Sequence, residues 1–237
     1  MKAMKSLNPL AIGALVTLCV LVLPVGTAMA QEDPRTFADT GYTVSDDAIW
    51  TFFDQYGGAA TFGQPISREF LLFGKPTQIF QNAALQVQAD GSEVQAMQLT
   101  DPSLLAAVQI KGLTVPAPDA ATAFVAPTPD QANYPARLQV FVQAVVREPF
   151  LSTFNNQGGA AVWGLPTSLS KADPNNPNFV YQRFQNGILF YNSSAGTTQA
   201  LPLGEYLKTQ LTSNSPLLTI ASTTNTDLSS AFLPDAV

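Results

Sequence analysis

The eleven residues GGAATFGQPIS at positions 57–67 return 101 residues later as GGAAVWGLPTS at positions 158–168. A second pair of similar segments follows them, QIFQNAALQV at 78–87 and QRFQNGILFY at 182–191. The offset between the copies grows from 101 to 104, and we place the three extra residues in a polar stretch, KADPNNPN, as expected of a surface loop. An internal repeat of this kind predicts two related structural units.

The residues before each double glycine predict a helix. In the first copy Ser45 is expected to cap a helix whose apolar residues recur at helical spacing, and Gly57 is expected to end it in a left-handed conformation. In the second copy a helix is expected over 147–157, closed by Gly158. The segment before it, 136–146, is compatible with a helix or a strand, because its apolar pattern satisfies both periods.

The repeated motif itself predicts a turn followed by a small sheet. Its glycines tolerate positive φ and its prolines stiffen the exit, whereas the aromatic residue is expected to fill a core and the glutamine to bond the backbone of the turn rather than a ligand. The Gln-x-Phe segments predict a strand, a turn at Asn82–Ala83 or Asn186–Gly187, and a return strand, with a third strand at 93–97 or 197–200. The motif residues are Gly57, Gly58, Phe62, Gly63, Pro65, Gln78 and Phe80 in the first copy, and Gly158, Gly159, Trp163, Gly164, Pro166, Gln182 and Phe184 in the second.

These elements predict an α+β fold. It contains two duplicated small modules, each a helix followed by a Gly/Pro turn and a short antiparallel β-hairpin or three-stranded sheet. The expected organisation is a signal peptide at 1–30, an N-terminal segment at 31–44, module 1 at 45–111, a Pro/Ala/Thr-rich linker at 112–136, module 2 at 137–211 and a low-complexity tail at 212–237. We expect the linker to be semi-extended and the tail to be poorly ordered or laid over a neighbouring surface.

The first thirty residues are typical of a secretory signal peptide. Two lysines precede an apolar stretch at 10–23, and Ala28 and Ala30 stand where small residues are needed for cleavage before Gln31. The alternative is an uncleaved anchor, which would be the chain's only contact with a membrane. The sequence therefore predicts a protein of the extracytoplasmic space, either secreted or held in the cell envelope.

The composition excludes several kinds of chemistry. The chain has no histidine and one cysteine, Cys19, which lies in the signal segment. Cysteine nucleophiles, histidine bases, Ser-His-Asp triads and zinc sites with His or Cys ligands are therefore absent from the secreted form, for which we expect no catalysis, no cofactor and no metal. Two of the 11 basic residues leave with the signal and all 17 acidic residues stay, so the charge is 9 − 17 = −8. No basic stripe is present, which argues against a nucleic-acid partner.

The motif resembles the LGFP-type repeats of bacterial envelope and secreted proteins, including longer repeats in secreted proteins of Chloroflexus-like bacteria. In those repeats an LGxP turn precedes a QxFxxGxIYW-like strand pair. The resemblance covers roughly half of the secreted chain and implies a non-catalytic module that holds proteins to wall glycans. The matching residues are Phe62 to Pro65, Gln78 and Phe80 in the first copy, and Trp163 to Pro166, Gln182, Phe184, Gly187, Ile188, Phe190 and Tyr191 in the second.

Candidate ligand-binding residues lie on the second predicted hairpin. Strand alternation is expected to place Tyr181, Arg183 and Tyr191 on one face, with Asn186 in the turn. Aromatic rings beside Arg and Asn could stack on sugars and bond their hydroxyl groups, so cell-wall or extracellular glycan is the expected ligand. Ordinary cross-strand packing is the alternative for these residues. A structural or accessory role in an envelope protein assembly, without glycan binding, is the alternative function.

Overall fold

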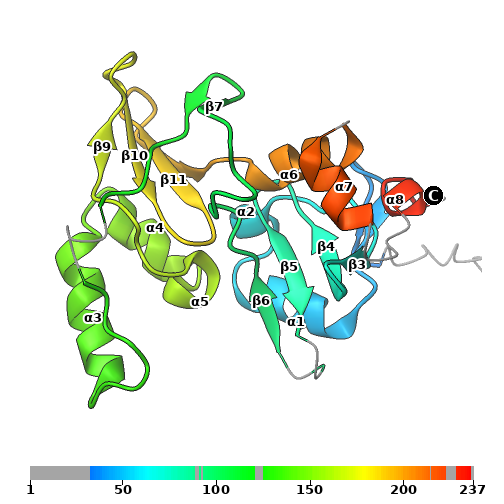
Figure 1. The fold of residues 1–237 in the computed structure, drawn as a ribbon, viewed down its shortest axis with the longest axis horizontal. Helices are drawn as coiled ribbons and strands as arrows, with labels where there is room; N and C mark the ends of the chain where they lie inside the picture. The colour runs from blue at the N-terminus through cyan, green and yellow to red at the C-terminus, as the bar shows by residue number, and fades with distance from the viewer. Residues whose placement is uncertain are drawn as a thin grey trace, which may run out of the picture. The chain divides into compact units, whose positions relative to one another are not determined.

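The computed structural model describes residues 33–88, 91, 93–120, 125–213, 215–222 and 228–235. The predicted signal peptide lies outside the described residues. Residues 33–237 form one compact unit, and the following description concerns that unit alone. It is a mixed α and β structure with small antiparallel sheets, which confirms the predicted α+β class (Figure 1).

The first half contains a four-stranded antiparallel sheet in which strands that are neighbours in sequence pair with one another. Two short helices precede this sheet and cover one of its faces, and a two-stranded ribbon precedes the helices. The elements are β1 (Thr36–Phe37), β2 (Tyr42–Thr43), α1 (Asp47–Gln55), α2 (Ala59–Phe62), β3 (Phe70–Leu72), β4 (Lys75–Ile79), β5 (Ala84–Val87) and β6 (Val94–Ala96).

The second half repeats this order of elements after a longer helix. Its sheet again pairs consecutive strands, in the order β9-β10-β11-β12. The elements are α3 (Tyr134–Val145), α4 (Phe150–Asn156), α5 (Gly159–Trp163), β9 (Lys171–Ala172), β10 (Phe179–Arg183), β11 (Ile188–Asn192) and β12 (Thr197–Ala200). The ambiguous segment 136–146 is therefore helical over nearly all of its length.

The remaining elements connect and close the two halves. A two-stranded ribbon follows the first sheet, and three helices follow the second. They are β7 (Gln109–Ile110), β8 (Leu113–Thr114), α6 (Leu203–Thr212), α7 (Pro216–Ser222) and α8 (Leu228–Ala231).

Local predictions were correct where a single residue type decides the backbone. Gly57 and Gly158 follow α1 and α4 with φ of 95° and 91°, and the third strands lie where they were expected. The predicted cap Ser45 was wrong: α1 is capped by Asp46, whose Oδ1 accepts a hydrogen bond from the backbone N–H of Ile49 at 2.8 Å. The expected sheets were also one strand short, because β3 and β9 are edge strands of three and two residues that carry little sequence pattern.

The predicted linker contains folded and docked residues. Leu113 and Thr114 form β8, Pro116 is buried, and the backbone N–H of Asp119 donates to the carbonyl oxygen of Thr167 at 2.9 Å. The Asp119 carboxylate also pairs with Lys171. The segment 113–119 is therefore held against the second half rather than extended in solvent, because its backbone and side chains find partners there.

Two buried cores hold the unit together, and each draws side chains from both halves. The core that includes Ile79 and Leu105 from the first half also includes Tyr181 and Leu207. The other core packs α1 and the face of β5 together with α3, α4 and the facing side of β11. Burial of large apolar side chains is the dominant favourable term in folding, so neither half closes its cores without the other.

Each half donates a backbone hydrogen bond to the hairpin turn of the other half, from positions that differ by one residue in the repeat. After β6, the backbone N–H of Thr100 donates to the carbonyl oxygen of Gln185 at 3.4 Å, in the β10–β11 turn. After β12, the backbone N–H of Glu205 donates to the carbonyl oxygen of Gln81 at 3.1 Å, in the β4–β5 turn. We call this arrangement the reciprocal docking of the two strand exits, 97–101 and 201–205.

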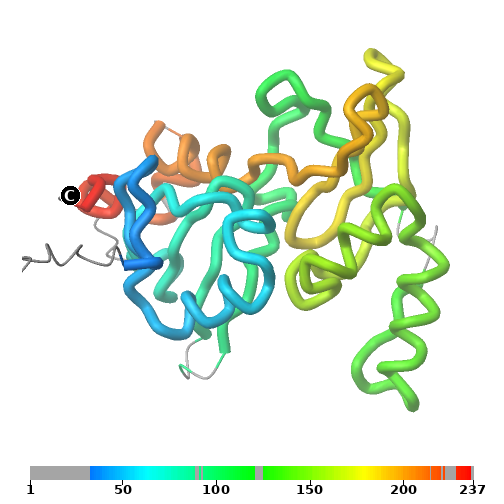
Figure 2. The backbone as a smooth tube through the Cα atoms, turned by 180° about the vertical axis from the view of Figure 1, so that it is seen from behind, coloured from blue at the N-terminus to red at the C-terminus, as the bar shows by residue number. Residues whose placement is uncertain are grey.

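The C-terminal residues pack against the start of the described chain (Figure 2). The Tyr42 hydroxyl donates to the carbonyl oxygen of Phe232 at 2.8 Å, and the backbone N–H of Thr43 donates to the Asp235 carboxylate at 2.9 Å. Asp235 also forms an ion pair with Arg68 at 2.7 Å. The described end of the tail, residues 228–235, is thus laid over a neighbouring surface.

Candidate functional site

The motif residues form the same hydrogen bonds in both halves. The Gln78 side-chain amide donates to the carbonyl oxygens of Ser67 and Thr43 at 3.0 and 2.9 Å. The Gln182 amide donates to those of Ser168 and Val145, both at 3.1 Å. Both glutamines are fully buried, as the predicted role in bonding the backbone requires.

The motif aromatics fill the core that was predicted for them. Phe80 stacks on Phe53 with ring centroids 5.0 Å apart, and Phe184 stacks on Phe154 at 5.2 Å. Phe62 and Trp163 lie at 6.2 and 6.4 Å from the rings of Phe80 and Phe184, with interplanar angles of 52° and 50°. These side chains are buried and are therefore structural.

The predicted ligand face on the second hairpin does not exist. Tyr181 pairs across the strands with Phe190, whereas Tyr191 pairs with Val180, so Tyr181 and Tyr191 point to opposite faces of the sheet. Tyr181 is 1% exposed and its hydroxyl donates to the Asp173 carboxylate at 3.1 Å. The predicted turn at Asn186–Gly187 would itself pair Tyr181 with Asn192 and place Tyr191 on the other face, so the prediction failed because alternation was applied to each strand without pairing the two strands.

Asp173 holds the buried Tyr181 hydroxyl and the β7–β8 ribbon in place. Its carboxylate accepts hydrogen bonds from Thr114 Oγ1 at 2.6 Å and from the backbone N–H of Asn175 at 2.8 Å, besides that from Tyr181. These bonds, first that of Thr114, lower the pKa of the Asp173 carboxyl from its usual 3.8. A carboxyl of lowered pKa stabilises the fold above its ordinary pKa, and this stabilisation is lost as pH falls through the lowered value.

We therefore expect Asp173→Asn to lower the free energy of unfolding at neutral pH, and the gap to the wild type to shrink as pH falls below about 4. Urea denaturation at pH 7 and at several values below pH 4 measures this gap. Asp54→Asn, at an exposed position of α1, is the control. A gap that is constant over the whole pH range would contradict a role for the ionised carboxylate.

Arg183, the second predicted ligand residue, is also inside the protein. Its side chain is 5% exposed, and its guanidinium donates to the carbonyl oxygens of Pro116, at 2.8 Å, and Thr100. Burial lowers the pKa of the guanidinium from its usual range, although an arginine stays protonated in proteins. Arg183 on β10 thus binds Thr100 and Pro116, which belong to the segment that runs from the first sheet to the second half.

Asn186, the fourth predicted residue, lies at a groove between the two halves. Its side-chain amide donates to the carbonyl oxygen of Val162 at 2.9 Å, just as that of Asn82 donates to Thr61 at 3.2 Å. It is half-buried and lines a hollow of about 440 Å³. This hollow is lined by Phe52 and Tyr56 of α1, by residues 93–96 and Gln98, and by Ala160, Ala161, Gly164, Gln185 and Asn186.

Two aromatic rings of α1 form the centre of this groove. Phe52 and Tyr56 are half-buried, with ring centroids 4.7 Å apart, and the Tyr56 ring lies against Gly158 of the second half. The same two rings, with Glu93 and Val94, line a second hollow of about 400 Å³. At the other end Gln98 and Gln185 also line a third hollow, of about 190 Å³. The three adjoining hollows are called the inter-half groove below.

The groove could not have been found from the repeat. It combines α1 and β6 of the first half with α5 and the β10–β11 turn of the second, and these parts are brought together by tertiary contacts such as that between α5 and β6. In the sequence, Phe52 and Tyr56 belong to the apolar residues that recur at helical spacing before Gly57. The only local signal was the pair of amide side chains at Gln95 and Gln98, which lie at or beside the end of a predicted strand.

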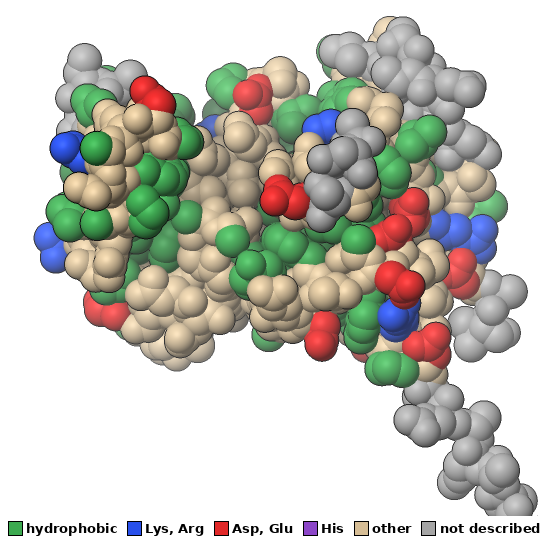
Figure 3. Space-filling model, turned by 90° about the horizontal axis from the view of Figure 1, so that it is seen from below, with side chains coloured by type: hydrophobic (Ala, Val, Ile, Leu, Met, Phe, Trp, Pro, Cys, Tyr) green, Lys and Arg blue, Asp and Glu red, His purple; other side chains and the backbone are tan. Residues whose placement is uncertain are grey.

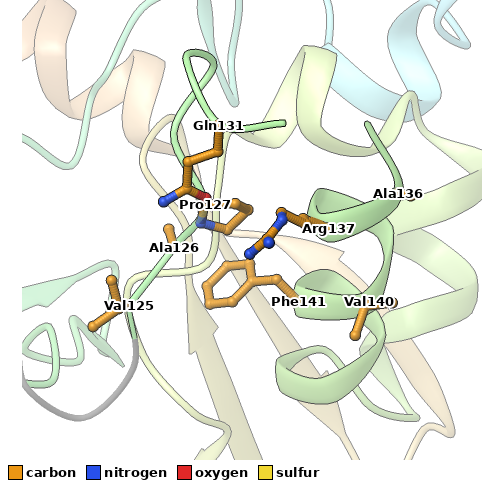
Figure 4. A pocket seen from close by; sticks show the side chains of 8 residues that line it. All are labelled: Val125, Ala126, Pro127, Gln131, Ala136, Arg137, Val140 and Phe141. Carbon is orange, nitrogen blue, oxygen red and sulfur yellow. The ribbon is translucent and has the colours of Figure 1, made fainter. Parts of the chain in front are cut away.

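A separate hollow of about 520 Å³ lies beside α3 (Figure 4). Figure 4 shows Phe141 and Arg137 of α3 facing Pro127 and Gln131. Val125 and Val140 at its edge are 83% and 67% exposed. In the space-filling view, hydrophobic side chains gather over the end of the molecule that α3 occupies (Figure 3).

Within the described ranges, no helix has the length and apolarity needed to cross a membrane, and no three His, Cys, Asp or Glu side chains are grouped as metal ligands. No family model, no curated protein sequence and no solved structure matches the chain.

Proposed function

We propose that the protein is a secreted, non-catalytic protein of the bacterial cell envelope that binds a glycan chain in the inter-half groove. The observation that carries this proposal is the groove itself, in which two adjacent aromatic rings lie beside four amide side chains and the Glu93 side chain. Sugar rings have apolar faces that stack on aromatic side chains, and hydroxyl groups that bond amides. A concave site with apolar platforms and a few placed polar groups has the composition of such a binding site.

The length of the groove supports a polymer rather than a small molecule. Hollows of about 400, 440 and 190 Å³ follow one another and share lining residues, with the rings of Phe52 and Tyr56 between the first two. A chain of sugars could therefore contact several of them at once. The absence of histidine from the whole sequence, together with the lack of cysteine after the signal segment, supports binding without catalysis.

We also propose that the two halves are copies of one LGFP-like module. Corresponding hydrogen bonds of Gln78 and Gln182, and corresponding stacked pairs at Phe80 and Phe184, support this view. The isolated bridges Pro65–Phe80 and Pro166–Phe184 match as well. In this proposal the copies have kept their turn and diverged on the surfaces that form the groove.

Gln95 provides a sharp test, because the repeat supplies its own control. Gln95 is exposed on β6 inside the groove, and Gln199 is exposed at the corresponding position of β12, outside the residues that line it. Loss of one neutral hydrogen bond is worth about 0.5–1.5 kcal/mol, or roughly a two- to tenfold weaker affinity. We expect this loss for Gln95→Ala and no change for Gln199→Ala.

The measurement is depletion of residues 31–237 from solution by insoluble peptidoglycan and by other insoluble polysaccharides. These residues include every described element of the fold. Binding to at least one polymer, weakened by Gln95→Ala alone, is the expected result. No depletion by any polymer, or equal weakening by both variants, would contradict the proposal.

A structural role in an envelope protein assembly is the second candidate, and the surface of α3 favours it. Val125 and Val140 are exposed apolar side chains beside a hollow lined by Phe141. Exposed apolar surface of this kind is typical of protein contacts. If the protein binds no polysaccharide but self-associates in sedimentation, and Val140→Glu abolishes the association, the assembly role is the correct one.

A further inference from the structure

The third hollow of the inter-half groove contains a buried positive charge. It is lined by Thr100, Asp101, Pro102, Pro118, Thr167 and Arg183, besides the shared Gln98 and Gln185. Arg183 is 5% exposed, so its guanidinium lies at the inner wall, whereas Asp101 is exposed at the mouth. The Asp101 carboxylate is engaged with Ser103, whose backbone N–H and hydroxyl both donate to it.

The charge of Arg183 has no carboxylate partner among the described residues. The four ion pairs of the described chain join Arg35 to Asp47, Arg68 to Asp235, Lys111 to Glu205 and Lys171 to Asp119. Arg183 instead donates to two neutral carbonyl oxygens. A guanidinium has five N–H donors, so others are left over, and a buried charge without a counter-charge is costly.

A second polar group at the same hollow is also unsatisfied. Thr167 Oγ1 is buried and has no hydrogen-bond partner among the described residues. Because this oxygen atom is itself closed off from solvent, the groups that can donate to an oxygen atom placed in the hollow are the remaining N–H groups of Arg183. Arg183 therefore calls for an acceptor that the described residues do not supply.

The corresponding positions of the first half are occupied by residues that serve packing alone. Ile66, Ile79 and Gly204 correspond to Thr167, Arg183 and Thr100 by the offsets of the repeat. Ile79 is fully buried and Ile66 packs against the same core. At Gly204 even a Cβ atom would lie 1.8 Å from the carbonyl oxygen of Phe80, so the position is filled. These positions are thus apolar and closely packed in the first half, whereas in the second half they are polar and line a hollow.

We infer that the hollow at Arg183 binds an oxyanion, a carboxylate or a phosphate, carried by a sugar residue of the glycan in the groove. This inference rests on the proposed glycan binding and narrows it to acidic glycans. Arginine pairs with both groups through charge-assisted hydrogen bonds, which are about twice as strong as neutral ones. With about 190 Å³ of space, the hollow accommodates such a substituent while the chain continues along Gln98 and Gln185 into the main groove.

Thr167→Ile tests the hollow without removing Arg183. It places at the site the residue that its counterpart position carries, narrows the hollow beside Arg183, and removes neither of the carbonyl oxygens that the guanidinium contacts. Thr167→Val is the matched control for volume, because it removes the hydroxyl but keeps the size. Arg183→Ala would also release Pro116 and Thr100, so it is less informative.

The experiment is isothermal titration of residues 31–237 at 0.15 M salt with three probes: hexagalacturonate, its full methyl ester and a glycerol phosphate oligomer. The ester keeps the sugar ring and removes the charge. We expect an acidic probe to bind at least about tenfold more tightly than the ester, since hydrogen bonds between charged groups are about twice as strong as neutral ones. Thr167→Ile is expected to remove that advantage and Thr167→Val to keep most of it. The two acidic probes separate carboxylate from phosphate recognition.

The outcomes distinguish this inference from the proposed function. If the ester binds as tightly as the acid, or if Thr167→Ile leaves the preference unchanged, the oxyanion site is wrong, whereas weakening by Gln95→Ala would still support glycan binding in the groove. No binding of any of the three probes also overturns the inference. The depletion assay with Gln95→Ala and Gln199→Ala then tests independently whether the groove binds a glycan.

Discussion

Phe184→Ala is expected to lower the free energy of unfolding by about 3–5 kcal/mol, the usual cost of truncating a buried phenylalanine. The side chain is fully buried, stacks on Phe154 and lies beside Trp163. Its removal leaves a cavity beneath the turn of the second half, where the backbone is held by several hydrogen bonds and cannot collapse. Urea unfolding followed by tryptophan fluorescence measures the loss.

The corresponding variant of the first half gives an internal comparison. Phe80→Ala removes a ring with nearly the same stacking geometry, so its cost should be similar. Leu169→Ala, at a position that is 50% exposed, should cost far less. A loss below about 1 kcal/mol for either phenylalanine would show that the site relaxes in a way that the packing does not suggest.

Gly204→Ala is expected to destabilise the protein by about 3 kcal/mol, although alanine is the better helix former. Gly204 lies in the first turn of α6, and a Cβ there would lie 1.8 Å from the carbonyl oxygen of Phe80 and 2.7 Å from that of Ala83. Both neighbours are backbone atoms, so they cannot rotate away. The substitution must therefore push the β4–β5 turn away from α6 or prevent the helix from docking.

Thermal unfolding with Thr209→Ala, an exposed position on the same helix, as control measures this effect. Hydrogen exchange of the Glu205 amide, which donates to Gln81, reports whether the docking itself has opened. A variant as stable as the wild type, with Glu205 still protected, would contradict the close approach.

The sequence predicted the elements that depend on local residues. The helix that precedes Gly57 and the hairpins around Asn82 and Asn186 follow from turn residues and periodicity, both of which act over a few positions. The predicted roles of Gln78 and Gln182 also held, because a repeated polar residue in an apolar strand needs a fixed backbone partner.

The features that the sequence did not predict depend on distant contacts. Tyr181 and Arg183 were expected at a surface, but the segment 98–118 from the first half covers that side of the sheet. The rings of Phe52 and Tyr56 line a hollow together with residues of α5 from the other half, a contact that the sequence of either copy does not contain. Repeat analysis describes each copy separately, so it does not predict surfaces that exist only between copies.

The reciprocal docking of the strand exits bears on how such a chain could arise. Each exit places a leucine, Leu99 or Leu203, in one shared core and anchors itself to the turn of the other half. Under the proposed duplication, a single ancestral module would have lacked that anchor and would have needed a second polypeptide, related to it by a two-fold axis, to supply it. Fusion of two such subunits turns a concentration-dependent homodimer into an intramolecular pair. It also frees the two copies to mutate independently, so one can stay closed around isoleucines while the other opens a polar hollow around Arg183.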